Sequence, residues 1–113
     1  MLDRTQGFAV RIVKLTAALP RGRIGDVLGR QLLRSGTSIG ANYREAVRAS
    51  SKRHFITNME IAQREAHETL YWLELLNETD LIKPARLKLI TKECDELLAI
   101  LTASIRTAKR NSR

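Results

Sequence analysis

The sequence contains few of the residues that build covalent cross-links or metal sites. Its 113 residues include one cysteine, Cys94, and two histidines. A single cysteine excludes a disulfide bond within the chain and is typical of a reducing compartment, so we expect a cytoplasmic protein. Because Cys94 falls on an apolar helical line, we interpret it as a core residue.

Motifs that would indicate an enzyme are also missing. Glu65 and Glu68 stand one helical turn apart, but a di-iron bundle needs a histidine three residues after a glutamate on two helices. Neither His54 nor His67 has that spacing. There is no phosphate-binding Gly-Lys-Ser/Thr loop. Residues 36–40 have the Gly-x-Ser-x-Gly spacing, but they fall inside an expected helix and so do not form the strand-to-helix turn of a nucleophilic serine. We therefore predict that the protein is not an enzyme and has no cofactor and no metal site.

Long apolar runs and aromatic residues are scarce as well. No apolar run approaches the length of a transmembrane helix, and the first residues lack the apolar segment and cleavage site of a signal peptide. We therefore expect a soluble protein with no membrane partner. Aromatic residues make up 4% of the chain, which argues against a stacking platform for single-stranded nucleic acid.

Apolar residues recur every three or four positions, which predicts amphipathic helices, and no stretch shows the sustained alternation of a strand. Pro20 and Gly22 mark the end of the first helix. Ser50 and Ser51 offer an N-cap to the third helix, and Pro84 suits the first position of the fourth. The expected helices cover approximately residues 3–18, 23–49, 52–78 and 84–109. Their short links predict an all-α fold, an antiparallel up-down four-helix bundle, with residues 1–113 as a single domain.

The second expected helix, residues 23–49, has three distinct faces. At 100° per residue, its apolar positions form a core face centred on Ile39. That face contains Ile24, Leu28, Leu32, Ser35, Ile39, Asn42, Tyr43 and Ala46. A buried amide needs hydrogen-bond partners, so we expect Asn42 to make a structural polar contact that fixes helix register or the choice of oligomer. Glu45 borders this face, and we expect it to pair with a basic residue of a neighbouring helix.

Glycine is concentrated on one side of the same helix. Five of the six glycines in the chain fall between Gly22 and Gly40. Four of them share one side of the helix: Gly25, Gly29, Gly36 and Gly40. Each glycine costs about 1 kcal/mol relative to alanine inside a helix, so a row of them predicts close approach by another helix. Two interpretations are open: tight packing within one subunit, or an interface between subunits.

Arginine residues occupy the face of this helix opposite the core. The only carboxylate on that arginine face is Asp26. The stripe consists of Arg23, Arg30, Arg34, Arg44 and Arg48. Lys52, Arg53 and His54 extend it into the first turn of the third helix, where the helix dipole favours acids instead. Charges opposite a core usually form a solvated face, but such a face normally mixes both signs. The bias therefore favours contacts with phosphate groups by Arg30, Arg34, Arg44, Arg48, Lys52 and Arg53.

The net charge of +8 is unevenly distributed along the chain. Residues 1–53 hold 11 Lys and Arg against 3 Asp and Glu, whereas residues 54–113 hold nine of each. Within the second half, residues 60–80 carry six carboxylates against Arg64 alone, and residues 106–113 carry four basic residues and no acid. This polarity predicts either a polyanionic partner or complementary faces that meet between subunits.

Tyr71 and Trp72 extend the apolar surface of the third expected helix beyond one stripe. Trp72 fits an anchor at a subunit interface, because its indole combines a large apolar surface with a polar N–H. It fits ordinary core packing equally well, and both interpretations are open.

The order of these residues resembles a known family of bacterial four-helix bundles. In the first half, the residues that carry the resemblance are Leu19-Pro20, Gln31-Leu32-Leu33-Arg34, Ser38-Ile39, Asn42 and Glu45. In the third helix they are Phe55-Ile56, Ile61-Ala62, Glu65-Ala66, Glu68-Thr69 and Tyr71-Trp72-Leu73. The family comprises proteins encoded in intervening sequences of large-subunit ribosomal RNA genes, and the similarity covers roughly residues 19–76.

The resemblance implies an up-down bundle that assembles as a homo-oligomer, typically a pentameric ring, and it implies no settled activity. A more distant relative, the accessory protein of diversity-generating retroelements, is a basic pentamer that works with a reverse transcriptase and nucleic acid. The partners implied for this chain are therefore copies of itself, RNA or DNA, and a reverse transcriptase or another protein.

Two functions are consistent with these patterns. The first is a nucleic-acid-associated accessory protein whose arginine stripe contacts phosphates without reading sequence. The second is a structural or protein-interaction module that binds no nucleic acid, in which the basic half of one subunit meets the acidic residues 60–80 of its neighbour. The first is favoured, because the net charge remains +8 after every pairing of opposite charges.

Overall fold

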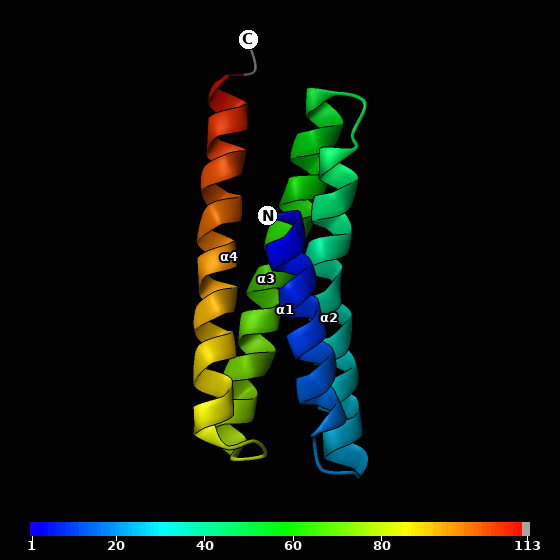
Figure 1. Cartoon of the computed structure of the whole chain (residues 1–113), viewed down its shortest axis with the longest axis vertical. Coiled ribbons are helices and arrows are strands. Elements are labelled where there is room, and N and C mark those ends of the chain that lie inside the picture. Colours follow the sequence, from blue (N-terminus) through cyan, green and yellow to red (C-terminus); the bar gives the residue numbers. More distant parts are fainter. Residues whose placement is uncertain (112–113) are drawn as a thin grey trace.

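The computed structural model describes residues 1–111 and contains four helices and no strand within that range. The helices are α1 (Leu2–Ala17), α2 (Arg23–Val47), α3 (Lys52–Thr79) and α4 (Pro84–Arg110). Each helix runs antiparallel to the one before it, in an elongated body of 50 × 20 × 20 Å (Figure 1). The predicted all-α, antiparallel up-down four-helix bundle is confirmed.

Local sequence signals fix the helix ends to within two residues of the expected positions. Ser51 is the N-cap of α3, and its hydroxyl oxygen accepts a hydrogen bond from the backbone N–H of His54 at 3.1 Å. Pro84 occupies the first position of α4, where its missing N–H has no helical partner to lose. At the other end of α3, Asp80 adopts a left-handed conformation with φ 58°, which stops the helix.

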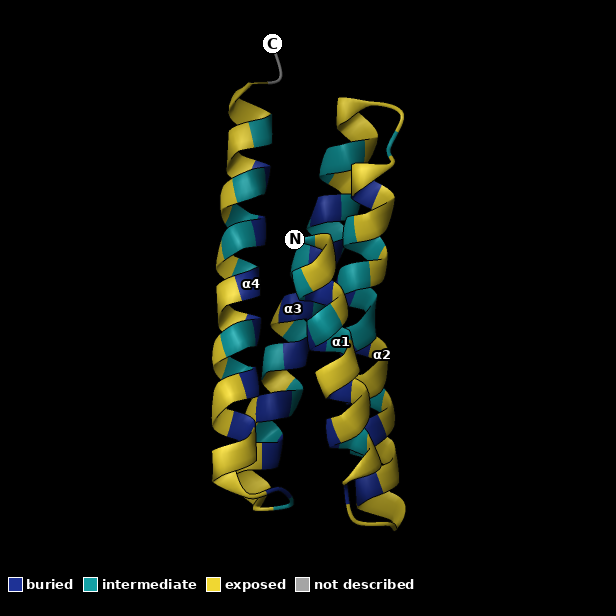
Figure 2. Cartoon of the chain, in the orientation of Figure 1, coloured by how far each residue is buried: buried dark blue, intermediate teal, exposed yellow. Residues whose placement is uncertain are grey.

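The core runs along the whole bundle and receives side chains from every helix (Figure 2). Its largest fully buried side chains are Phe8, Ile12, Leu32, Ile39, Met59, Leu73, Leu76, Leu87, Leu97 and Leu101. Cys94 belongs to it, as expected, and its thiol donates to the Ala66 carbonyl at 3.5 Å. Burial raises the pKa of the Cys94 thiol to about 12, with smaller contributions from Asp95 and Glu93.

The buried face of α2 is rotated relative to the sequence expectation. Ile24, expected in the core, is 65% exposed, and Asn42 is only partly buried. Gly25, Gly29 and Gly36 are buried instead. The reason is that α1 lies over the glycine side of α2, which shifts the covered face toward the glycines. Placing Ile24 in the core was therefore wrong.

The first helix is much shorter than the other three. Its 16 residues span about 24 Å, whereas the 27 residues of α4 span about 40 Å. It begins short of the end at which α2 finishes and α3 begins, so that end of the bundle is built from the other three helices (Figure 1). Contact between α1 and α4 is sparse, and ion pairs from Arg4 and Arg11 to Glu93 bridge the two helices.

Candidate functional site

Arg34, one of the six expected phosphate contacts, lies on the side of α2 that faces α3. Its guanidinium forms ion pairs with Glu65, at 3.3 Å, and with Glu68. The hydrogen bond to Glu68 raises the pKa of Arg34 further above its ordinary value. Two carboxylates therefore already neutralise this arginine, and its first role is to join α2 to α3.

Glu68 also links Arg34 to the tryptophan. Its carboxylate accepts a hydrogen bond from Trp72 Nε1 at 3.0 Å, and this bond, with the one from Arg34, holds the pKa of Glu68 below its ordinary value. The Tyr71 ring meets the Trp72 ring edge-on, with centroids 4.9 Å apart and planes at 71°. Trp72 is partly buried, whereas Tyr71 is 58% exposed, so Tyr71 is the aromatic side chain that this face offers to solvent.

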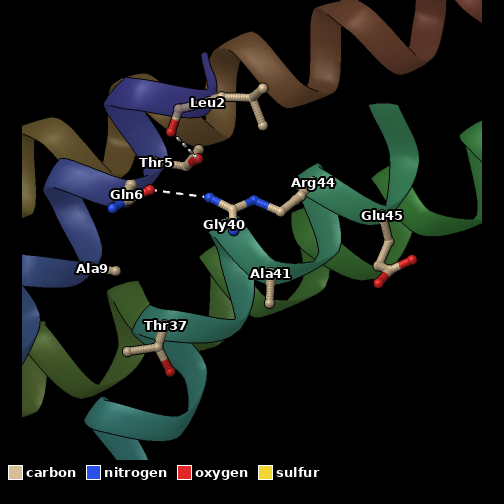
Figure 3. Close-up of a pocket in the computed structure, with 9 residues that line it drawn as sticks. All are labelled: Leu2, Thr5, Gln6, Ala9, Thr37, Gly40, Ala41, Arg44 and Glu45. Atoms are coloured by element: carbon tan, nitrogen blue, oxygen red, sulfur yellow. Dashed lines mark hydrogen bonds between the residues drawn. The ribbon is translucent and has the colours of Figure 1, made fainter. Parts of the chain in front are cut away.

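Arg44 lies on the side of α2 that faces α1, at a groove of about 390 Å³ between the two helices (Figure 3). Its guanidinium reaches across the groove and donates to Gln6 Oε1 at 3.0 Å. Glu45 lies beside it, exposed, and forms no ion pair with any of residues 1–111. The expected pairing of Glu45 with a neighbouring helix is therefore absent from the described part of the chain.

The row of glycines faces α1 and the link that follows it. A Cβ atom on Gly36 would lie 2.8 and 2.9 Å from Ile12 Cγ1 and Cγ2, and one on Gly25 only 2.0 Å from the carbonyl oxygen of Pro20. A Cβ atom on Gly29 would meet Leu19 at 3.1 Å, and one on Gly40 would meet Thr5 at 3.3 Å. The contacts described for these glycines are thus made within one subunit.

The hydrogen bond described for Asn42 lies within α2: its side-chain amide donates to the Ser38 carbonyl at 2.8 Å. Its expected role in helix register or in the choice of oligomer stays a prediction. A buried polar contact between helices lies two turns earlier, where the hydroxyl of Thr69 on α3 donates to the hydroxyl of Ser35 on α2 at 3.0 Å. Sequence reasoning placed Ser35 in the core but missed this pair, because periodicity alone does not show which residue of α3 lies opposite.

The remaining expected contacts, Arg30, Arg48, Lys52 and Arg53, are exposed. None of the four forms an ion pair with a carboxylate of the described chain. They do not form one cluster, however. Arg30 and Arg48 are 18 residues apart on a continuous helix, which is about 27 Å. Arg48, Lys52 and Arg53 gather at the α2–α3 link, and Arg30 lies toward the other end of the bundle.

The end of α4 adds basic residues that the sequence-based site did not include. Lys52 Nζ donates to the backbone carbonyl of Asn111 at 2.6 Å, so the start of α3 and the end of α4 are in contact. This brings Arg106 and Arg110 to the same end of the bundle as Arg48 and Arg53. The sequence signal for these additional contacts was the basic tail, residues 106–113, which the up-down topology places at this end. Arg113 itself lies outside the described residues.

Two further observations concern other kinds of site. Within residues 1–111, no three His, Cys, Asp or Glu side chains are grouped so that they could hold a metal ion. No helix of the same range is both long enough and apolar enough to cross a membrane.

Comparison with known proteins identifies similar sequences and structures. The model of the family described as 23S rRNA-intervening sequence protein matches residues 1–103. A crystal structure of a protein of unknown function from the S23 ribosomal protein family of Bacteroides thetaiotaomicron shares 44% sequence identity with this chain. The alignment covers 92% of this chain and 96% of that one, with a TM-score of 0.87. A search of curated proteins found no match.

Proposed function

The chain belongs to the 23S rRNA-intervening sequence protein family, and from that membership we propose that it is a non-enzymatic, oligomeric accessory protein that binds nucleic acid. Binding is through phosphate groups, so it is strong at low salt and independent of sequence. Both RNA and DNA can be bound through such phosphate contacts. The resemblance to retroelement accessory proteins adds a reverse transcriptase, or another protein, as a partner of the complex.

One observation carries this proposal: the fold leaves most of the excess positive charge unneutralised. The ion pairs of the described chain use only Arg4, Arg11, Arg34 and Lys109. A protein whose charges served only solubility would usually intersperse both signs over its surface. Exposed cations that have no carboxylate partner are available for phosphate groups, and each contact releases counterions from the nucleic acid.

The six proposed contacts contribute unequally. Arg48, Lys52 and Arg53 form the main group, and Arg30 is a separate contact farther along α2. Arg34 would have to exchange its two carboxylates for phosphate, so it contributes mainly by neutralising Glu65 and Glu68. Arg44 is free to turn from Gln6 to a phosphate, because a neutral amide is a weaker acceptor than an anion.

We propose further that the protein acts as a homo-oligomer, with the pentameric ring that the family resemblance implies. Tyr71 and Trp72 are the proposed interface residues, supported by the exposed ring of Tyr71 and by the hydrogen bond that orients Trp72. Subunit copies around a ring would multiply the phosphate contacts of one chain, which raises affinity without any new kind of contact.

The second candidate function is a protein-interaction module that binds no nucleic acid. The observation in its favour is the acidic surface next to Tyr71 on α3. Glu74, Glu78 and Asp80 are exposed there and form no ion pair within the described chain. In this alternative, the basic residues of a neighbouring subunit or of a protein partner cover that surface, and high salt loosens the assembly.

The test is a titration of fluorescently labelled duplex RNA and duplex DNA with purified protein at several salt concentrations. We expect binding that weakens steeply with salt, in proportion to the number of phosphates contacted. The double variant Arg48→Gln with Arg53→Gln should bind more weakly and with a shallower salt dependence. Both positions are exposed and unpaired, so the fold should remain intact.

The matched control is Arg21→Gln with Arg23→Gln, which removes the same charge at the other end of α2. It should keep most of the affinity. Absence of wild-type binding at low salt would refute the nucleic-acid proposal and favour the interaction module. Sedimentation at increasing salt then distinguishes the alternative, because an assembly that is indifferent to salt contradicts charge pairing between subunits.

A further inference from the structure

Three helix ends lie together at one end of the bundle. They are the last turn of α2, the first turn of α3 and the last turn of α4 (Figure 1). Two side-chain contacts hold α4 against α3 here: Lys52 Nζ to the Asn111 carbonyl at 2.6 Å, and Lys109 Nζ to Glu60 Oε2 at 2.9 Å. The ends are therefore joined into one surface rather than three separate tips.

This surface carries a strong excess of positive charge. Residues 44–60 and 102–111 contain seven Lys and Arg but only two carboxylates, Glu45 and Glu60. The opposite end, residues 16–30 and 72–92, has seven Lys and Arg as well but four carboxylates. Six exposed cations of the first surface form no ion pair with a described carboxylate. Arg44 donates to Gln6 on α1 instead, and we call the other five the basic end: Arg48, Lys52, Arg53, Arg106 and Arg110.

Helix electrostatics explain only part of this cluster. A cation near the C-terminus of a helix interacts favourably with the helix dipole, which accounts for Arg48 on α2 and for Arg106 and Arg110 on α4. Lys52 and Arg53 are the first two residues of α3, where the same dipole disfavours cations. Positive charge thus collects at this end whichever way the helix points, as expected for a surface that meets an anion.

We propose that the basic end binds the backbone of double-stranded nucleic acid, with Arg106 and Arg110 of α4 as contacts alongside Arg48, Lys52 and Arg53. This inference rests on the proposed function and assigns its location and its substrate class. A duplex presents about one phosphate per 1.7 Å of its axis, twice the density of one of its strands. A compact set of cations can therefore contact more phosphates on a duplex than on a single strand. Five phosphate contacts predict that a plot of log K against the logarithm of salt concentration has a slope of about −4 to −5.

The surface lacks what a single strand would require. Single-stranded nucleic acid is bound by stacking its bases on exposed aromatic rings. Two aromatic residues lie near this surface, Tyr43 and Phe55. Both are partly buried and pack against the core. Among the described residues of this end, phosphate contacts are therefore the main source of affinity, and these favour the duplex.

The decisive variant is Arg106→Gln with Arg110→Gln, compared with Arg86→Gln and Lys88→Gln. Both pairs remove two exposed, unpaired cations from α4, one pair at the basic end and the other at the opposite end. The probes are a short RNA duplex, the corresponding DNA duplex and a single strand of equal length. Circular dichroism melts of both variants check that helix content and stability are retained.

We expect the Arg106/Arg110 variant to lose about one to two orders of magnitude of duplex affinity at 0.1 M salt and about two units of salt dependence. The Arg86/Lys88 variant should stay close to the wild type. Equal losses in the two variants would overturn the location while leaving the proposed function standing. Tighter binding of the single strand would overturn the substrate class. Absence of wild-type binding to any probe would refute the proposed function, and this inference with it.

Discussion

The clearest prediction concerns Gly36, where α1 passes close to α2. Replacing an exposed helical glycine by alanine usually stabilises a protein by about 0.5–1 kcal/mol. At Gly36, however, the new Cβ would lie 2.8 and 2.9 Å from Ile12 Cγ1 and Cγ2, and Ile12 is fully buried. Forcing apart a packed core costs about 1–3 kcal/mol, so we expect Gly36→Ala to destabilise the protein by a net 1–2 kcal/mol, approximately.

Substitutions at two other glycines provide comparisons for the free energy expected at Gly36. At Gly7 the new Cβ would meet only Arg11 Nη1 at 3.8 Å, an ordinary contact, so Gly7→Ala should stabilise by about 0.5–1 kcal/mol. At Gly25 it would lie 2.0 Å from the carbonyl oxygen of Pro20, and a backbone atom yields less than a side chain. Gly25→Ala should therefore be the most damaging, at more than about 3 kcal/mol.

The assay is urea denaturation followed by circular dichroism, with thermal melts as a second readout. For a chain of this size, 1 kcal/mol corresponds to about 4 °C in Tm. A double-mutant cycle identifies the clash: in an Ile12→Ala background, Gly36→Ala should lose its cost and become mildly stabilising. If Gly36→Ala were as stable as Gly7→Ala, or kept its full cost without Ile12, packing of α1 on the glycine row would not be what requires Gly36.

Three further predictions test the interior and the α2–α3 contact. Thr69→Val, which leaves the buried Ser35 hydroxyl without its partner on α3, should destabilise by about 1 kcal/mol in urea denaturation, and a neutral result would show that the pair contributes nothing. Because the pKa of Glu68 is lowered in the folded protein, its contribution to stability is present above the unfolded pKa and is lost as the pH falls through the folded pKa. The fluorescence of Trp72, the single tryptophan, should therefore change with a midpoint below the ordinary glutamate range, and Glu68→Gln should abolish that transition. Cys94, with its pKa raised to about 12, should react with a thiol reagent at neutral pH only when the protein is denatured, and rapid labelling of the native protein would contradict its burial.

The helices could be predicted from local chemistry, because each end is marked by a residue that acts on its own neighbours. Ser51 caps α3 and Pro84 opens α4 without help from distant residues. The core face of α2 was less accurate at Ile24, since a periodic pattern does not reveal on which side the next helix lies. The buried glycines were the better guide to that side.

The candidate site was harder to predict, because it depends on how far one helix is displaced along another. That displacement places Glu65 and Glu68 opposite Arg34, and no periodicity within α2 reveals it. The contribution of Arg106 and Arg110 required the topology as well, because they are more than fifty residues from Lys52 in sequence but share its end of the bundle.

The order in which the helices pack also has a kinetic meaning. Each helix contacts mainly its neighbours along the chain, and the sparse contact between α1 and α4 is the one that joins the first helix to the last. Most native contacts are therefore local in sequence, which is the topology of chains that fold within microseconds to milliseconds. The hydrophobic core can form before the termini meet. We therefore expect the ion pairs of Arg4 and Arg11 with Glu93 to form late in folding and to weaken as salt is added.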